Sequence, residues 1–346
     1  MTPELGVVLL GGDLDTVRDV SERAEAAGLD SVWTTEFYER TATVSLAVMA
    51  QAISSVTVGS AIAYAVGRPP LILAAEARDL DELSRGRLVL GLGTGTKTMQ
   101  RDWHGVDPSS RAVRVEELVP LLRAIWSMDD SGLDHDGRFY SLHLRSTIDV
   151  TPPFRSDIPV YLAGVNPRMV TSAGRVADGL IGHPLFTRRY VEEVVRPALA
   201  SGAAQRGRTS DDVTVAGYVL CSLHEDPEVA RTEAKAQIAF YAVVRTYATI
   251  FELHGHGDAA TRARAAWQRR DREGMVAAIP DEFVDVMALT GWPDEVREQF
   301  YADYADLYDH SLLYSPSFGL PTERLSDNVT ALIETFARVP AGPVDQ

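Results

Sequence analysis

The chain has 346 residues, of which 45% are hydrophobic and 24% charged, so it is long enough to bury a sizeable core. Its formal charge of −16 argues against binding to nucleic acid or to anionic membrane surfaces. No apolar run is long enough to span a bilayer, the start lacks a signal-peptide pattern, and Cys221 is the single cysteine. We therefore expect a soluble, cytoplasmic protein without structural disulfides.

Short apolar runs alternate with amphipathic stretches of helical periodicity along the chain. Predicted strands in the first half lie at residues 5–10, 31–34, 56–60 and 88–91, and predicted helices at 14–27, 43–54, 70–83 and 111–126. The second half continues with strands at 159–163, 178–181, 213–220 and 311–314, and with helices at 167–174, 188–200 and 322–336.

The pattern of eight strand–helix units predicts the fold. The strands do not alternate in polarity, which indicates a parallel sheet buried on both faces. Eight such units favour a closed (β/α)₈ TIM barrel over an open doubly wound sheet. We expect one domain over residues 1–346 with two insertions, at about 129–157 and 226–290, the second of them mostly helical. Both insertions are candidates for a lid that excludes water from the active site.

In such a barrel the active site lies at the carboxyl ends of the strands. In this sequence those segments lack the catalytic or metal-binding residues that several classes of barrel enzyme need. A metal-dependent hydrolase would have a His-x-His pair near the first strand, whereas His254 and His256 fall in the helical insertion, where a solvated loop is expected. A retaining glycosidase needs two carboxylates, and only Glu36 is evident. Schiff-base chemistry has only Lys97. We expect no metal site.

The strand ends are instead rich in Gly, Ala, Ser and Thr, which suits a large cofactor held by main-chain groups. The segment 91–96 has the sequence Gly-Leu-Gly-Thr-Gly-Thr. It lacks the third glycine and the following acidic residue of a dinucleotide-binding fingerprint. We interpret it as a platform of small residues under a flat ring or a phosphate, with an ordinary tight turn as the alternative.

Several segments, taken in chain order, resemble the luciferase-like monooxygenase superfamily, a barrel family that uses FMN or the deazaflavin coenzyme F420. The segments that carry the resemblance are 68–70, 74–95, 159–164, 173–179 and 291–296. The resemblance implies a non-prolyl cis peptide bond at Ala61–Ile62, behind the cofactor ring, and a homodimer. Together with the strand ends it implies a cofactor site formed by Ser60, Ala61, Ile62, Gly93, Thr94, Gly95, Thr96, Ala163, Gly164, Val165 and Asn166.

The resemblance also singles out Glu36, because related enzymes carry an acidic residue at the end of strand two. Phe37 follows where sugar-phosphate dehydrogenases of the family have a histidine base, which argues against a sugar phosphate as substrate. We predict that Glu36 contacts the cofactor ring or relays a proton, with a strand-end salt bridge as the alternative. His183 and His104 are weaker candidates for a general acid, and either can be purely structural.

The segment 101–105 and the helix after it resemble the F420-dependent branch of the family more than the luciferases. We therefore expect an F420-dependent oxidoreductase that moves a hydride between C5 of the deazaflavin and a small organic substrate. An FMN-dependent monooxygenase that uses FMNH2 and O2 is the alternative, and a non-catalytic flavin-binding relative is a third. A separate reductase or dehydrogenase that recycles the cofactor is an expected partner.

Overall fold

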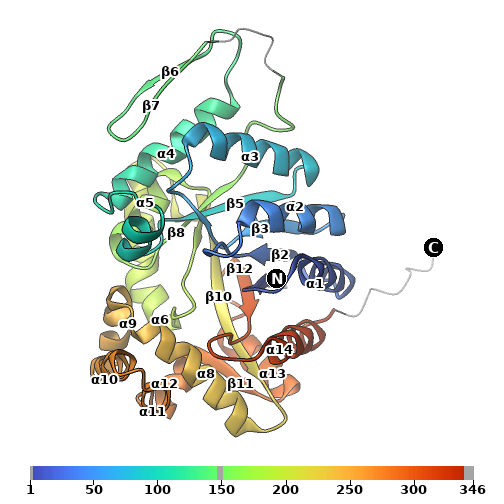
Figure 1. The fold of residues 1–346 in the computed structure, drawn as a ribbon, viewed down its shortest axis with the longest axis vertical. Helices are drawn as coiled ribbons and strands as arrows, with labels where there is room; N and C mark the ends of the chain where they lie inside the picture. Colours follow the sequence, from blue (N-terminus) through green and yellow to red (C-terminus); the bar gives the residue numbers. More distant parts are fainter. Residues whose placement is uncertain (1–2, 146–150, 339–346) are drawn as a thin grey trace, which may run out of the picture.

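The structure, a computed structural model, describes residues 3–145 and 151–338, and eight parallel strands within these ranges form a closed barrel (Figure 1). The barrel strands are β1 (Glu4–Leu9), β2 (Ser31–Thr34), β3 (Thr57–Ser60), β5 (Leu88–Gly93), β8 (Val160–Ala163), β9 (Gly179–Ile181), β10 (Thr214–Leu223) and β12 (His310–Tyr314). Strand β10 pairs with both β9 and β12, and β12 pairs with β1, which closes the sheet. The predicted TIM barrel is confirmed.

Helices cover the outside of the barrel at the predicted places, and α13 (Pro293–Asp303) is added to them. They are α1 (Leu14–Ala26), α2 (Ala42–Ala52), α3 (Pro70–Leu83), α4 (Arg111–Trp126), α5 (Pro167–Val176), α6 (Arg188–Tyr190), α7 (Arg196–Ala204), α13 (Pro293–Asp303) and α14 (Thr322–Thr335). Polar side chains begin several of them; the Asp13 carboxylate, for example, accepts the N–H of Thr16 at 2.8 Å. The helix expected at residues 188–200 is instead two α-helical segments joined by a π-helical turn at Val191–Val195. In the described part of the chain, no helix has the length and apolar character needed to cross a membrane.

Trp33, on β2, is completely buried in the barrel. Its ring lies against Gly59, where a Cβ atom would come within 2.2 Å of the indole. Its Nε1 donates to the Ser31 hydroxyl at 2.6 Å, and that hydroxyl lies 2.7 Å from Nε2 of His310. Side chains pack this part of the barrel, and the ligand site of such a barrel is expected at the carboxyl ends of the strands.

The insertion at 129–157 forms a projecting hairpin in its described part. Strands β6 (Leu133–Asp136) and β7 (Ser141–Leu144) pair antiparallel and extend beyond α3 and α4 (Figure 1). The carboxylate of Glu117, on α4, holds the hairpin turn by accepting the N–H groups of Arg138 and Phe139, at 3.0 and 3.1 Å, and of Tyr140 at 2.9 Å. Residues 146–150 of this insertion lie outside the described residues.

The insertion at 226–290 is mostly helical. Its helices are α8 (Pro227–Ala242), α9 (Ala248–Leu253), α10 (Gly257–Gln268), α11 (Arg272–Ala277) and α12 (Asp281–Met287). It also contains β11 (Ala288–Gly291), a strand that the sequence did not indicate, which pairs parallel with the far end of β10. The long strand β10 thus carries the insertion beyond the barrel, and α13 then returns the chain to the outer helical layer.

Candidate active site

The ladder between β3 and β5 is interrupted at residues 60–62 and resumes at β4 (Ala63–Tyr64). Across this gap the Ser60 hydroxyl donates to the carbonyl of Gly91 at 2.8 Å and accepts the N–H of Gly91 at 3.0 Å, replacing two backbone bonds of the sheet. The Ala61–Ile62 peptide bond is cis, as the resemblance implied. The Tyr218 hydroxyl donates to the Ala61 carbonyl, so the displaced backbone has its own hydrogen-bond partner.

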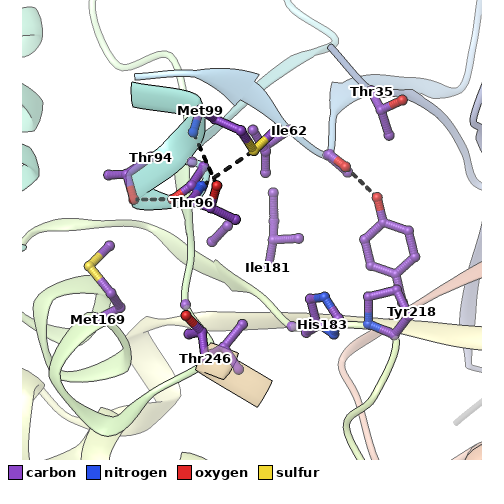
Figure 2. A pocket seen from close by; sticks show the side chains of 18 of the residues that line it. Thr35, Ile62, Thr94, Thr96, Met99, Met169, Ile181, His183, Tyr218 and Thr246 are labelled. Atoms are coloured by element: carbon purple, nitrogen blue, oxygen red, sulfur yellow. Dashed lines mark hydrogen bonds between the residues drawn. The ribbon is translucent and has the colours of Figure 1, made fainter. Parts of the chain in front are cut away.

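A cavity of about 330 Å³ opens next to this gap, at the carboxyl ends of the barrel strands (Figure 2). Its volume lies at the lower end of the range for small-molecule sites. The predicted cofactor residues that line it are Ala61, Ile62, Gly93, Thr94, Gly95, Thr96, Ala163, Gly164, Val165 and Asn166. Ser60 is separated from the cavity: it is fully buried, and its hydroxyl bridges β3 and β5.

Other residues that line the cavity were not predicted from the sequence. Tyr218 comes from β10 and Arg111 from the start of α4, whereas Tyr241, Thr246 and Tyr247 come from the second insertion. The second insertion therefore forms part of the cavity wall. The described residues of 129–157 line no part of it, so they give no support to this segment as a lid, and its role stays a prediction.

Glu36 lies at the edge of the cavity and is 8% exposed. One carboxylate oxygen accepts the N–H of Tyr64 at 2.7 Å and Nη1 of Arg68 at 2.9 Å, while Nη2 of Arg68 donates to the other oxygen. These bonds raise the pKa of Arg68. Glu36 thus lines the cavity and also forms the salt bridge that the sequence offered as the alternative. Because both oxygens are engaged, the geometry favours an anchoring role over proton relay.

His183 lies on the cavity wall between two tyrosines of the second insertion. Its ring centroid is 4.0 Å from that of Tyr247 and 4.8 Å from that of Tyr241. Burial lowers the pKa of His183 to about 3, so the ring is neutral near pH 7. Its Nδ1 accepts the N–H of Leu185 at 3.2 Å, which puts the ring proton on Nε2. His183 is therefore a hydrogen-bond donor rather than the cationic acid that the sequence led us to consider.

His104 does not line the cavity. Its ring packs edge-on against Tyr64, with centroids 4.6 Å apart, and fills the space beside Gly67. A Cβ atom on Gly67, whose φ is +88°, would lie 2.6 Å from Nδ1 of His104. The structure thus places His104 behind Tyr64 and gives it a packing role. Its proposed role as an acid has no geometric support.

His254 and His256 are held by contacts within the second insertion and with Thr187. Nε2 of His254 lies 2.9 Å from the Thr187 hydroxyl, and both imidazoles pack against Phe283. Within the described ranges, no group of three or more His, Cys, Asp or Glu side chains is arranged to hold a metal ion.

The family model for luciferase-like monooxygenases matches residues 3–311. The chain belongs to this family. An uncharacterised protein of Mycobacterium tuberculosis is 33% identical over 284 residues, covering 80% of this chain and 83% of its relative. A 5,10-methylenetetrahydromethanopterin reductase of Archaeoglobus fulgidus is 26% identical over 283 residues, covering 80% and 82%. A putative coenzyme F420-dependent oxidoreductase of M. tuberculosis is also 26% identical, over 293 residues, covering 80% and 84%.

Solved structures show the same fold with both cofactors of the family. The F420-dependent tetrahydromethanopterin reductase of Methanopyrus kandleri superposes with a TM-score of 0.78 at 23% identity, covering 98% of this chain and 100% of its own. The oxygenating constituent of 3,6-diketocamphane monooxygenase from Pseudomonas putida, solved with FMN, gives 0.67 at 16% identity, covering 97% and 98%. The luciferase-like protein described here is therefore an oxidoreductase of a class whose members use F420 or FMN.

Proposed function

We propose that the protein is a coenzyme F420-dependent oxidoreductase that transfers a hydride between the deazaflavin and a small organic substrate. The observation that carries this proposal is a continuous floor of small and apolar groups at three adjacent strand ends. A Cβ atom on Gly93 would lie 2.7 Å from Cγ1 of Ile62 and 3.3 Å from Cβ of Ala163, so these residues pack directly against one another. Such a floor suits one face of a flat ring.

Polar groups on the neighbouring strand ends suit the rest of the cofactor. Thr94, Thr96 and Asn166 line the same cavity, and Nη1 of Arg111 donates to the carbonyl of Gly95 at 3.2 Å. Arg111 therefore brings a fixed positive charge to the rim, where it would hold the phosphate that F420 and FMN both carry. When bound, the deazaflavin supplies or accepts the hydride at C5. The protein orients the ring and keeps water away.

The choice of F420 is supported by two curated relatives, one named a methylenetetrahydromethanopterin reductase and the other a putative F420-dependent oxidoreductase. FMN remains the alternative, since it has a similar ring and phosphate. An F420 enzyme would need a second enzyme, a reductase or dehydrogenase, to regenerate the cofactor in the form it uses. An FMN monooxygenase would need a reductase and O2.

A side-by-side titration tests the proposal. F420 fluorescence and FMN fluorescence are followed as purified protein is added, with the parent chain, Arg111→Met and the control Arg297→Met. Arg297 lies on α13 and pairs only with Asp294 of the same helix in the described structure. We expect saturable F420 binding, at least tenfold weaker for Arg111→Met, and parent-like binding for Arg297→Met. Tight FMN binding without F420 binding would overturn the choice of cofactor.

We also propose that the protein is a homodimer. Large apolar side chains are exposed on two helices that lie side by side: Val44 on α2 is 49% exposed, and Ile72 on α3 is 49% exposed. The Thr43 hydroxyl donates to the Glu76 carboxylate at 3.0 Å and joins these helices near the same edge. Sedimentation of the parent and of Ile72→Asp tests this; we expect a dimer and a monomer, respectively, and a monomeric parent would refute it.

A further inference from the structure

Two side chains on one wall of the cavity each have a hydrogen-bond donor without a protein acceptor. The first is Nε2 of His183. Its ring is held by packing against Tyr247 and by the bond from the Leu185 N–H to Nδ1, and neither contact uses the proton on Nε2. None of the described residues accepts a hydrogen bond from Nε2. In Figure 2, His183 lies beside Ile181, on the opposite side of the view from Thr96 and Met99.

The second donor is the hydroxyl of Tyr241, on α8. The Tyr314 hydroxyl donates to its oxygen at 3.2 Å, and Tyr314 is itself completely buried. Gln237, one turn earlier on α8, has its carbonyl oxygen occupied by the N–H groups of Ser317 and Phe318 at 2.8 and 2.9 Å. Because these bonds hold the carbonyl oxygen toward the loop after β12, the NH2 group of Gln237 points away from that loop.

The NH2 group of Gln237 therefore faces the Tyr241 hydroxyl. Burial raises the pKa of Tyr241, and hydrogen bonds from Tyr314 and Gln237 oppose that rise. The oxygen of Tyr241 is thus used as an acceptor, and its own proton remains free. Within the described ranges, no residue accepts that proton.

The two donors are neighbours, and neither carries a charge. The rings of His183 and Tyr241 meet at 73° with their centroids 4.8 Å apart, and both residues line the cavity. Of the charged groups that line the cavity, Glu36 is bound by Arg68, and Arg111 is bonded to the Gly95 carbonyl, where the proposed function assigns it to the cofactor phosphate. Two neutral donors offer hydrogen bonds but no charge of their own, so they suit an uncharged ligand oxygen better than an anionic one.

We propose that Nε2 of His183 and the hydroxyl of Tyr241 form a two-donor subsite for one uncharged oxygen, the carbonyl oxygen of the substrate. This inference rests on the proposed function, because it gives the hydride acceptor a place in the same cavity. Two hydrogen bonds to a carbonyl oxygen draw electron density from the carbon and make it a better acceptor for a hydride. The substrate class is therefore a ketone or aldehyde, or the corresponding alcohol in the reverse direction.

Infrared spectroscopy of a bound ketone tests the subsite directly. Cyclohexanone labelled with ¹³C at the carbonyl is titrated into the parent chain, His183→Phe, Tyr241→Phe and the control Tyr301→Phe. Tyr301 is 51% exposed on α13, outside the cavity. We expect the parent to lower the carbonyl stretching frequency relative to an apolar solvent. Each subsite variant should lose part of that shift and weaken binding by up to about tenfold, whereas the control should match the parent.

Three outcomes overturn the subsite: no saturable ketone binding to the parent, an unchanged frequency in both subsite variants, or tighter binding of cyclohexanecarboxylate than of cyclohexanone. Thermal melting of each variant checks that it folds. The same samples are titrated with F420. A parent that binds F420 without shifting the carbonyl frequency refutes the subsite alone, whereas one that shifts the frequency but ignores F420 refutes the choice of cofactor alone.

Discussion

The two insertions of this barrel differ in position and in consequence. The hairpin β6–β7 and the helices α8–α12 lie at opposite ends of the molecule (Figure 1). The hairpin follows helix α4, and its described residues stay away from the cavity. The second insertion follows strand β10 and contributes Tyr241, Thr246 and Tyr247 to the cavity wall.

The difference follows from where each insertion leaves the barrel. A segment that follows a strand starts at the carboxyl ends of the strands, where the active site lies, whereas one that follows a helix starts at the opposite end. Their composition did not reveal this, and both insertions were candidates for a lid. The preceding element is the better guide to whether an insertion can reach the site.

The largest effect is expected from Gln237→Leu, which removes the link between the second insertion and the loop after β12. Gln237 is 2% exposed, and its loss leaves the N–H groups of Ser317 and Phe318 without their acceptor. We expect a loss of about 2 kcal/mol in the free energy of unfolding, measured with urea. Ketone affinity should also fall about tenfold, because Tyr241 loses its neighbour on α8.

Gln299→Leu provides a matched control for this prediction. Gln299, on α13, makes a similar pair of bonds, accepting the Thr290 N–H at 3.2 Å and donating to the Thr290 carbonyl at 3.1 Å. Gln237 also bonds to Tyr241, which lines the cavity, whereas Thr290 does not line it. We expect it to lower stability while leaving ketone affinity within about twofold of the parent. Equal losses of affinity in both variants would show that the second insertion has no special connection to the site.

A smaller effect on the free energy of unfolding is expected when the pH is lowered. Its size depends on how far the second insertion shields His183 from water. Burial lowers the pKa of His183 to about 3, below the 6.5 of an unfolded chain. The unfolded state therefore takes up a proton first, so the stability of the parent is complete above pH 6.5 and falls as the pH drops toward 3. The contribution to the slope is at most about 1.4 kcal/mol per pH unit, reduced by the opening of the cavity to solvent.

Urea unfolding of the parent and of His183→Phe between pH 4 and 8 measures this contribution. Burial also lowers the pKa of His310 to about 4, but His310 is present in both chains, so its effect cancels in the difference. We expect a shallower acid slope for His183→Phe. Identical slopes would mean that the tyrosines of the second insertion leave His183 accessible to water.

The barrel could be predicted from the sequence because its strands are short apolar runs that alternate with stretches of helical periodicity. Strand β2 was predicted with its observed bounds, Ser31–Thr34, and α3 with its bounds Pro70–Leu83. Strand β11, Ala288–Gly291, was missed because it directly follows helix α12, so no turn residues separate it from the helix. Its pairing with β10 is a tertiary contact without a local signal.

The candidate site could be predicted only where strand ends define it. Strand-end residues such as Gly93 and Ala163 were found by their position in the fold, and they line the cavity. Tyr241 and Tyr247 were not found, since nothing local distinguishes a pocket-facing tyrosine of an insertion from one in the core. Ser60 was misplaced because its small polar side chain suits a ligand contact as well as the bridge to Gly91 that it makes.

The smallest effect is expected at the hairpin, where Glu117→Gln weakens an anchor far from the site. Burial disfavours the charged form of Glu117, but the N–H groups of Phe139 and Tyr140 and the His135 ring outweigh it and lower the pKa of this carboxyl below 4.5. The anchor is therefore complete above pH 4.5 and is lost as the pH falls through the lowered value. At pH 7 the substitution exchanges a charged acceptor for a neutral one, which weakens these hydrogen bonds without removing them. We expect faster proteolysis within residues 129–145 but F420 and ketone affinities within about twofold of the parent, because the described hairpin residues do not reach the cavity. A loss of ligand affinity as large as that of Gln237→Leu would contradict the distinction between the two insertions.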